Sequence, residues 1–284
     1  MKKYVALMMI FLSLLFCVSC GEGNAPENSS SDKGNDTASS VTVDILKIGK
    51  ADCIIIDTGS HIVMIDAGEA ENLSNVKSYL NGKKITTIDM LILTHYDKDH
   101  IGGAADIINT YNVLKVVEGP RISNNAEYLS YHSAIEDGET ELIKLSQNQT
   151  VSFDNCELNI NIPKKLKYSE KTENNSSLVV SLVHGENKLL FCGDAMEIRL
   201  NELIAAGYSD YDLIKLPYHG NYLENYREFL SMVSPKYAVV TNSKKNPGDS
   251  ETYNLLSEMD IKLYQTKNGQ INITSNEGGL TVKQ

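Results

Sequence analysis

The stretch "IDMLILTHYDKDHIGG", residues 88–103, decides which fold this chain is expected to adopt. It begins with a nearly unbroken apolar run, which is typical of a buried strand. Four residues that commonly bind metal ions follow within six positions: His95, Asp97, Asp99 and His100. Gly102 and Gly103 then lead into a segment with helical periodicity. The cluster is therefore predicted to lie in a loop between the carboxyl end of a strand and the start of a helix.

Two later segments have the same construction. The apolar run "LLFCGD" ends at Asp194, and "LIKLPYHG" leads to His219. Carboxylates and imidazoles suit Zn²⁺, Mn²⁺ or Fe, and groups this crowded repel one another unless a cation binds them. Three strand ends that each deliver such residues predict a dinuclear hydrolytic site. In such a site two metals roughly 3.5–4 Å apart act on the attacking and the leaving oxygens.

The rest of residues 41–284 alternates strand-like and helical segments. Apolar alternation and hairpin signals mark the strands, and amphipathic segments such as "EIRLNELIAAG" mark the helices. Each half of this region combines strands with helices, an order that suits two stacked sheets with helices outside. About 244 residues are enough for one such α/β domain. Residues 112–150 are harder to interpret and are expected to shape a substrate groove.

The first 40 residues differ from the rest in composition. Residues 1–20 contain two lysines, an apolar run of signal-peptide length and the ending "CVSC", which resembles a bacterial lipobox with Cys20 as the lipidated residue. Cys17 stands where a lipobox usually has Leu, so plain secretion with cleavage nearby remains an alternative. Residues 21–40 are polar and rich in Gly, Ser and Asn, which predicts a flexible linker. Either way we expect export, and with Cys20 lipidated we expect a lipid-anchored extracytoplasmic protein.

The chain carries a formal net charge of −11, and removal of residues 1–20, with two lysines and no acid, makes it −13. This charge argues against binding nucleic acid through a generally basic surface, although a local basic patch is compatible with it. Three cysteines remain outside the leader if Cys20 is lipidated, and they match no zinc ribbon. They are interpreted as packing residues.

The motif "THYDKDHIGG" is similar to the His-x-His-x-Asp-His signature of the metallo-β-lactamase superfamily, in the variant with Asp at the second His. That variant resembles the hydrolase domains of ComEC-like DNA-uptake proteins and of secreted phosphorylcholine esterases. The segments "DILKIGKADCIIIDTGSHIVMIDAG", "NNSSLVVSLVHGENKLLFCGD" and "DLIKLPYHGN" resemble further motifs of the family, in order. The resemblance spans residues 41–284 and implies the four-layer αββα sandwich of that superfamily, an α/β (α+β) fold.

The resemblance also implies roles for individual residues. His95 and Asp97 match ligands of a first metal, Asp99 and His100 ligands of a second, Asp194 the bridging carboxylate and His219 the last ligand of the second metal. Asp66 matches a residue that hydrogen-bonds to ligands, Asp52 matches the acidic residue of a Gly-Gln-Gly-Asp turn near the site, and Asn175 falls where many members have a ligand His. Because Asn is a poor zinc ligand, the first site is expected to be weaker or to take Mn²⁺. Asp249 stands where ComEC-like chains commonly have His.

Each residue also has a structural interpretation. The cluster at 95–100 could be a solvated acidic loop, Asp194 a helix N-cap and His219 part of a turn. All three motifs in order favour metal ligands instead. His61, His132 and His184 are expected to be structural.

These features predict an exported metal-dependent hydrolase with two divalent ions, Zn²⁺ or Mn²⁺. A metal-bound hydroxide would attack a phosphodiester, either nucleic acid or a small molecule, and Asp99 would orient or deprotonate the water. Two alternatives remain: a phosphorylcholine-esterase-like activity on envelope components, and a non-catalytic binding lipoprotein on the same fold. No protein partner is predicted.

Overall fold

The computed structural model describes residues 40–153 and 155–284. The expected signal peptide, the lipidation site at Cys20 and all but the last residue of the expected linker lie outside these residues. Within them, no helix is both long and apolar enough to cross a membrane.

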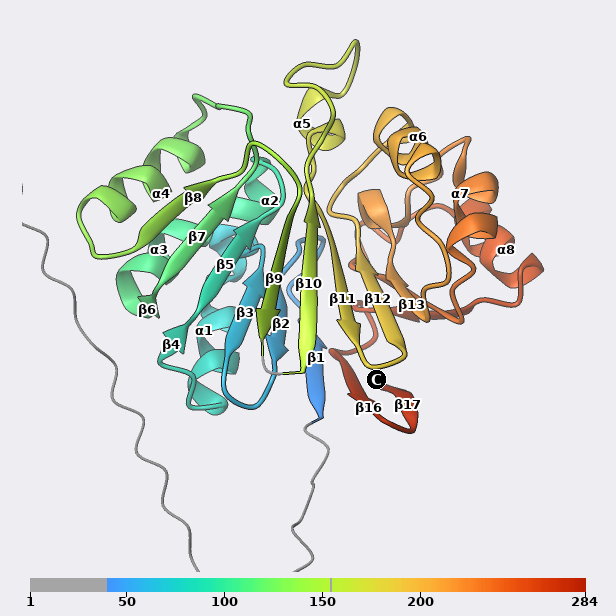
Figure 1. Ribbon diagram of the computed structural model, residues 1–284, viewed down its shortest axis with the longest axis horizontal. Coiled ribbons are helices and arrows are strands. Elements are labelled where there is room, and N and C mark those ends of the chain that lie inside the picture. The colour runs from blue at the N-terminus through green and yellow to red at the C-terminus, as the bar shows by residue number, and fades with distance from the viewer. Residues whose placement is uncertain (1–39, 154) are drawn as a thin grey trace, which may run out of the picture. The chain divides into compact units, whose positions relative to one another are not determined.

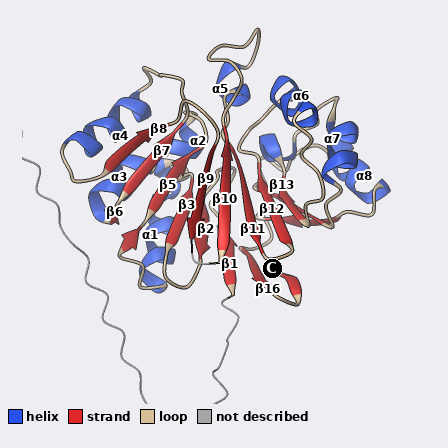
Figure 2. Ribbon diagram, viewed as in Figure 1, coloured by secondary structure: helices blue, strands red, loops and turns tan. Residues whose placement is uncertain are grey.

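Two β-sheets pack face to face, and helices cover the outer face of each (Figures 1 and 2). Helices α1, α3 and α4 lie on one side of the molecule, and α6, α7 and α8 lie on the other (Figure 1). The expected four-layer αββα architecture is therefore confirmed.

The first sheet has the strand order β17 (Gly279–Lys283), β16 (Ile271–Asn276), β1 (Val41–Ile45), β2 (Ile54–Asp57), β3 (Ile62–Ile65), β5 (Met90–Leu93), β7 (Lys115–Glu118) and β8 (Glu141–Lys144). The second has the order β15 (Lys262–Gln265), β14 (Tyr237–Val240), β13 (Leu213–Lys215), β12 (Asn187–Phe191), β11 (Val179–His184), β10 (Cys156–Asn161) and β9 (Gln149–Phe153). Two short strands, β4 (Thr87–Ile88) and β6 (Asn112–Val113), pair separately.

The helices are α1 (Leu73–Gly82), α2 (Lys98–Ile101), α3 (Ala104–Thr110), α4 (Ala126–Glu136), α5 (Thr172–Asn175), α6 (Glu197–Ala205), α7 (Tyr226–Val233) and α8 (Ser250–Glu258). Two 3-10 turns are η1 (Ala70–Asn72) and η2 (Pro217–Gly220). Residues 112–150, which are hard to interpret from the sequence, thus contain β6, β7, α4, β8 and the start of β9.

Three apolar cores lie between the four layers. Alternate side chains of each strand point into different cores. In β2, Ile54 and Ile56 lie in the core between the sheets, whereas Ile55 lies in the core beneath the helices of the first sheet. In the second sheet, Leu189 faces the other sheet and Leu190 packs under α6, α7 and α8. Because successive side chains of a strand point to opposite faces, continuous apolar runs supply two cores at once.

The strands that lead to the candidate ligands run parallel within each sheet. In the first sheet β3, β5, β7 and β8 are parallel, and in the second β12, β13, β14 and β15 are parallel. The two carboxyl edges meet, since the backbone N–H of Leu178 donates to the carbonyl oxygen of Thr94 across the sheets. Loops from both sheets therefore converge at one edge, where open α/β sheets commonly bind ligands.

Candidate metal centre

The loop after β5 carries the first part of the centre. Helix α2 is a single turn with Asp97 at its N-cap, so Asp99 and His100 lie on the helix. A Cβ atom on Gly103 would lie 2.4 Å from the carbonyl oxygen of Ala67. Because Gly102 and Gly103 have no side chains, the loop that follows β3 can pack closely against the chain just after His100.

Asp66 in that loop holds two parts of the cluster together. Its φ of 58° is left-handed, a conformation that costs a non-glycine residue about 1–3 kcal/mol. Its carboxylate accepts hydrogen bonds from the Thr94 backbone N–H (2.8 Å) and hydroxyl (2.7 Å). His100 Nδ1 lies 2.7 Å from the same carboxylate. Because Nδ1 is engaged, the His100 ring presents Nε2 to the centre, which is how metal-binding histidines are commonly oriented.

The other two histidines are held in the same way. His95 Nδ1 lies 3.2 Å from Thr94 Oγ1. His219, left-handed at φ 53° in η2, has its Nδ1 2.9 Å from Thr241 Oγ1 and 3.1 Å from the Thr241 carbonyl oxygen. In all three rings Nδ1 has a partner, and Nε2 is left to face the centre.

Asp194 enters from the end of β12 through a tight turn. Gly193 has φ 54°, and a Cβ atom there would lie 3.1 Å from the side chains of Ser177 and Thr94. The backbone N–H of Asp194 donates to Ser177 Oγ at 3.1 Å. The carboxylate is thereby directed toward the loop that carries the histidines.

Asp99, His100, Asp194 and His219 each place one ligand atom within 4.8 Å of the others. His219 Nε2 lies 3.2 Å from Asp194 Oδ2 and 3.4 Å from Asp99 Oδ2. His100 Nε2 lies 3.4 Å from Asp194 Oδ1. The structure thus brings together the four residues expected around the second metal.

The residues expected around the first metal lie beside this group. His95 Nε2 lies 3.6 Å from Asp97 Oδ2, and the His95 and His100 ring centroids are 4.1 Å apart. Asn175 is placed differently, since its amide oxygen accepts from the Arg199 backbone N–H and its nitrogen donates to the Glu170 carbonyl oxygen. The neighbouring Asn174 is the amide that reaches the centre, with Nδ2 3.4 Å from Asp194 Oδ2.

Several ligand-type atoms in this cluster have no hydrogen-bond partner. Among the described residues, six buried side-chain N or O atoms have none. Four belong to the cluster: His95 Nε2, His100 Nε2, His219 Nε2 and Asp194 Oδ1. An unsatisfied buried polar atom costs about 1–3 kcal/mol, so four of them facing one another fit a bound cation.

A buried lysine in the centre was not anticipated from the sequence. Lys215, at the end of β13, is fully buried and forms an ion pair with Asp52. Its Nζ also donates to the Gly193 carbonyl oxygen at 3.0 Å and lies 4.0 Å from Asp194 Oδ1. Asp52 in turn accepts from Thr241 Oγ1 at 2.6 Å, so it is linked to the residue that holds His219. The sequence did contain one sign of this buried charge, which is the lysine within the apolar run "LIKLPY".

The charges of the centre set the pKa values of its residues. Burial favours a raised pKa for Asp194, but His219 and His100 outweigh it and hold the pKa well below the usual range. Burial alone would lower the pKa of His100, but Asp194, Asp66 and Asp52 raise it well above the usual value. Without metal, the electrostatics therefore favour an ionised Asp194 beside a protonated His100, a pattern of charge in which a cation would stabilise the carboxylates.

A polar cleft of about 580 Å³ opens beside the cluster. Its lining residues are Lys50, Glu69, Glu71, Asp97, Lys98, Asp99, Lys245 and Asn246. Lys50 donates to Asp99 Oδ2 at 3.0 Å, and Lys98 pairs with Glu69 at 2.8 Å. The lining holds three lysines and four carboxylates, and Lys245 is the lysine of this cleft whose ammonium group has no ion-pair partner among the described residues.

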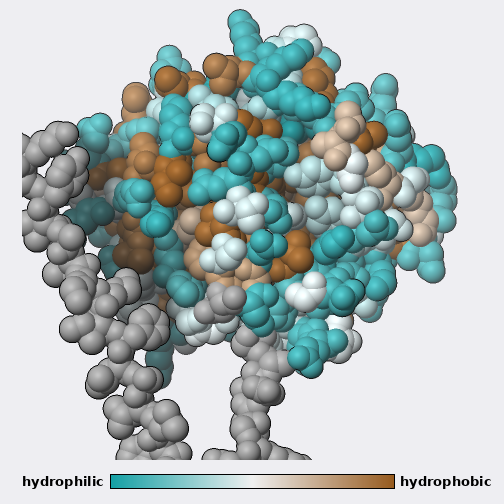
Figure 3. Space-filling view, viewed as in Figure 1, coloured by the Kyte–Doolittle hydropathy of each residue, from teal (hydrophilic) through white to brown (hydrophobic). Residues whose placement is uncertain are grey.

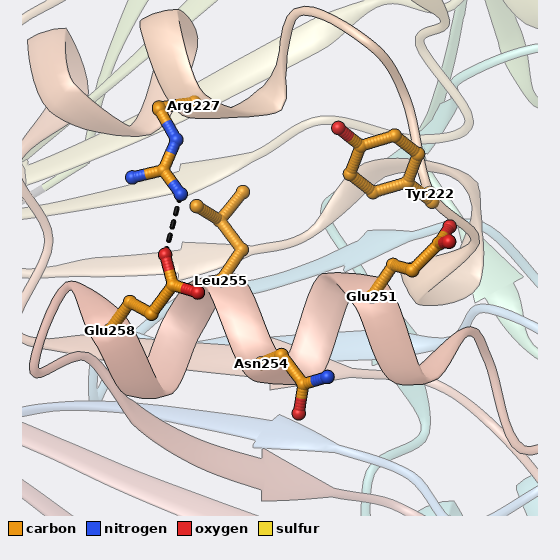
Figure 4. A pocket seen from close by; sticks show the side chains of 6 residues that line it. All are labelled: Tyr222, Arg227, Glu251, Asn254, Leu255 and Glu258. Carbon is orange, nitrogen blue, oxygen red and sulfur yellow. Dashed lines mark hydrogen bonds and ion pairs between the residues drawn. The ribbon is translucent and has the colours of Figure 1, made fainter.

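A second hollow between α7 and α8 has a different character (Figure 4). Its one cation, Arg227, is paired with Glu258 at 2.5 Å, and Glu251 adds a further carboxylate. Tyr222 closes one end (Figure 4). This hollow offers no ligand set for a metal and no unpaired cation for an anion.

Within residues 40–153 and 155–284, His132, His184 and the thiols contribute no atom to the candidate ligand groups. His184 Nδ1 lies 2.8 Å from Ser275 Oγ, and His132 Nε2 lies 3.0 Å from Glu118. Cys53 and Cys192 are buried, and burial raises the pKa of Cys192 to about 12. These residues serve packing and internal hydrogen bonding.

Two stacked sheets with outer helices, and a carboxylate–imidazole cluster at their shared carboxyl edge, define an αββα protein with a candidate dinuclear metal site. The chain belongs to the metallo-β-lactamase superfamily, whose family model matches residues 43–241. Members of this superfamily are generally metal-dependent hydrolases that bind a dinuclear metal site.

Relatives place the chain more narrowly. It is 25% identical over 247 residues to "Recombination protein 2" of Haemophilus influenzae, covering 84% of this chain and 28% of that protein. It is 24% identical over 253 residues to "ComE operon protein 3" of Bacillus subtilis, covering 81% of this chain and 32% of that protein. The chain thus spans about a third or less of the length of these relatives. The expected resemblance to the ComEC-like branch is confirmed.

Solved structures agree on the fold. CmlA, a diiron β-hydroxylase from Streptomyces venezuelae, matches with a TM-score of 0.52 and 14% identity, over 84% of this chain and 54% of that one. At this identity the likeness concerns the fold alone.

Proposed function

We propose that this protein is an exported, metal-dependent hydrolase that cleaves phosphodiester bonds. The observation that carries the proposal is the set of four buried ligand atoms without hydrogen-bond partners, three of them imidazole Nε2 atoms whose Nδ1 atoms are engaged. The lysines of the adjacent cleft and the ComEC-like relatives favour a phosphodiester, in nucleic acid or in a small molecule.

The proposal assigns two divalent ions, Zn²⁺ or Mn²⁺, to two groups of ligands. Asp99, His100 and His219 would hold one ion, His95 and Asp97 the other, and Asp194 would bridge them. When bound, such ions lower the pKa of a water molecule and stabilise negative charge on a phosphate oxygen.

Residues of the chain supply the remaining steps. Asp99 is the carboxylate proposed to orient the attacking water and accept its proton, because it also borders the cleft. Lys50, hydrogen-bonded to Asp99, would position that carboxylate and face the substrate. Asp66 and Thr241 hold the histidine rings.

The proposal also places the protein at the outer face of the cell membrane, anchored through a lipid on Cys20. The support is the leader-like composition of residues 1–20 and the polar segment that follows. Replacement of Cys20 by Ser should release the protein from the membrane fraction, and retention there would contradict the anchor.

The activity is tested by metal analysis together with hydrolysis of bis-p-nitrophenyl phosphate. We expect close to two tightly bound metals per chain, and loss of turnover in Asp97→Ala and Asp194→Ala. Asp106→Ala, at an exposed aspartate of α3, is the matched control and should retain both properties. No tight metal, and no turnover with added Zn²⁺ or Mn²⁺, would leave the binding-lipoprotein alternative.

A further inference from the structure

A lysine-rich loop projects beside the metal centre. Residues 163–171, "PKKLKYSEK", connect β10 to α5 and form the extended loop above α5 in Figure 1; we call them the lysine loop. The loop carries four lysines and one glutamate, Glu170, in a chain whose formal net charge is −11. Hydrophilic residues predominate where it projects (Figure 3). The loop is thus a positively charged segment in a negatively charged chain.

The base of the loop is fixed, so its tip has a defined position. Tyr168 is buried, and its hydroxyl donates to Glu202 of α6 at 2.9 Å. The backbone N–H of Lys164 donates to the same carboxylate at 3.1 Å. Arg199, itself buried, pairs with Glu202 and reaches the Asn161 carbonyl oxygen at the end of β10. Residues 164–167 between these anchors are all exposed.

The lysines of the loop differ from Lys50, Lys98 and Arg121, three cations near the centre that are already paired. Lys50 pairs with Asp99, Lys98 with Glu69, and Arg121 with Glu173 at 2.6 Å. Within the parts of the chain that the structure covers, no ion pair or side-chain hydrogen bond engages the ammonium groups of the loop lysines: Lys164, Lys165, Lys167 and Lys171. These four positive charges are available to an anion from solution.

The loop is also continuous with the metal centre. Lys171 precedes Asn174 by three residues, which span at most about 10 Å. Asn174 Nδ2 lies 3.4 Å from Asp194 Oδ2, and Ser177 in the same segment holds the Asp194 backbone. An anion bound at Lys171 therefore lies close to the centre but outside it, and Lys164, Lys165 and Lys167 extend the positive charge four to seven residues further along the loop.

We propose that the lysine loop binds phosphate groups of a phosphodiester chain that extends beyond the bond held at the metal centre. The inference rests on the proposed function and narrows its substrate from any phosphodiester to a polymer of phosphodiesters. A negatively charged body repels such a polymer, and a local cluster of free cations beside the centre would capture it and direct it to the ligands. Leu166, 59% exposed among the lysines, would contact an apolar part of the chain.

The test compares two sets of three substitutions in the full chain. The loop variant is Lys164→Gln, Lys165→Gln and Lys167→Gln; Lys171 is kept because it is the N-cap of α5, whose Asn174 contacts Asp194. The control variant is Lys115→Gln, Lys236→Gln and Lys262→Gln, three exposed lysines at the amino ends of β7, β14 and β15, away from the centre. Binding of a single-stranded oligothymidylate and of poly(glycerol phosphate) is measured between 50 and 200 mM salt, to distinguish nucleic acid from an envelope polymer.

The loop variant should bind at least one of the two polymers at least tenfold more weakly at low salt. The slope of log K against log salt should fall by about 2, since each lost contact to a single strand contributes about 0.7. Turnover of bis-p-nitrophenyl phosphate should stay within twofold in both variants, and the control variant should bind like the unmodified chain.

Unchanged binding of both polymers by the loop variant, or an equal loss in the control variant, would overturn the inference. The inference would also be overturned if the loop variant lost binding only to phosphatidylglycerol vesicles, because that result would assign the loop to a membrane surface. If no variant hydrolyses bis-p-nitrophenyl phosphate while polymer binding depends on the loop, the proposed activity fails and the binding surface stands.

Discussion

Lys215 and Asp52 form an ion pair in the interior, beside the candidate metal centre, although 163 residues separate them in the chain. The centre contains five aspartates: Asp52, Asp66, Asp97, Asp99 and Asp194. The buried ammonium group of Lys215 offsets the charge of Asp52. Lys50, paired with Asp99 at 3.0 Å, offsets another, so a formal charge of −3 remains, which divalent cations would offset. The pair is therefore expected to serve both stability and metal binding.

Lys215→Met should destabilise the metal-free protein by about 3–5 kcal/mol, because it leaves the Asp52 carboxylate buried without its partner. Urea unfolding in the presence of a chelator measures this loss. Lys236→Met removes an exposed lysine that pairs with Asp212 at 2.9 Å, and it should leave the urea midpoint nearly unchanged, because water screens exposed ion pairs. Adding Asp52→Asn to Lys215→Met should recover part of the loss, and no recovery would argue against the pair as its cause.

Asp66→Asn should weaken metal binding about 10–100-fold, since it removes the charged partner that orients the His100 ring. Titration calorimetry with Zn²⁺ or Mn²⁺ measures the affinity. The same change at the exposed Asp106 should leave it unaffected. Equal affinities in Asp66→Asn and the unmodified chain would mean that His100 is held in place without this bond.

The pH dependence of stability should differ in sign between metal-free and metal-loaded protein. Without metal, the pKa of His100 is well above its usual value of about 6.5. This residue therefore stabilises the fold fully below pH of about 6.5, and its contribution is lost as pH rises toward the raised pKa. Metal binding requires unprotonated imidazole, so its stabilising effect grows over the same range.

Thermal unfolding from pH 6 to 9 checks this expectation. The midpoint should fall with pH in chelator, while the increment produced by added metal should rise. His100→Gln should flatten the metal-free profile. An increment that does not change with pH would show that binding displaces no protons from these rings.

Gly103→Ala should destabilise the protein by about 1–3 kcal/mol, because the added methyl would lie 2.4 Å from the Ala67 carbonyl oxygen. Gly82→Ala in α1 is the matched control, since its Cβ meets no atom within 4 Å. That change should be neutral or stabilising by up to about 1 kcal/mol. Denaturant midpoints compare the two, and similar effects would rule out the steric reason.

Much of the fold could be predicted from the sequence, because continuous apolar runs and helical periodicity are local signals. The strand before His95, the helix after Gly103 and the later strand–loop units at Asp194 and His219 all lie where the sequence places them. Strand β8 and helix α5 were not anticipated, because the β8 segment "ELIK" has only two apolar residues and the α5 segment "TENN" has none.

The candidate site was predicted less completely than the fold. The role of Lys215 depends on Asp52, and no local pattern connects residues so far apart. Asn175 was singled out by its position relative to family motifs. The structure instead directs Asn174 toward Asp194, because a shift of one residue along a helix turns the side chain by about 100°.

The pairing of β16 with β1 has a consequence for biosynthesis. Asp44 and Asn272 face each other in this pairing across 228 residues of sequence, and Ile271 and Ile273 complete the core between the sheets. Until residues 271–276 have left the ribosome, one edge of β1 has no neighbour, although every candidate ligand has already been translated. A nascent chain in this state exposes an unpaired strand edge to other chains. Chaperone dependence should therefore persist until residues 271–276 are available to pair with β1.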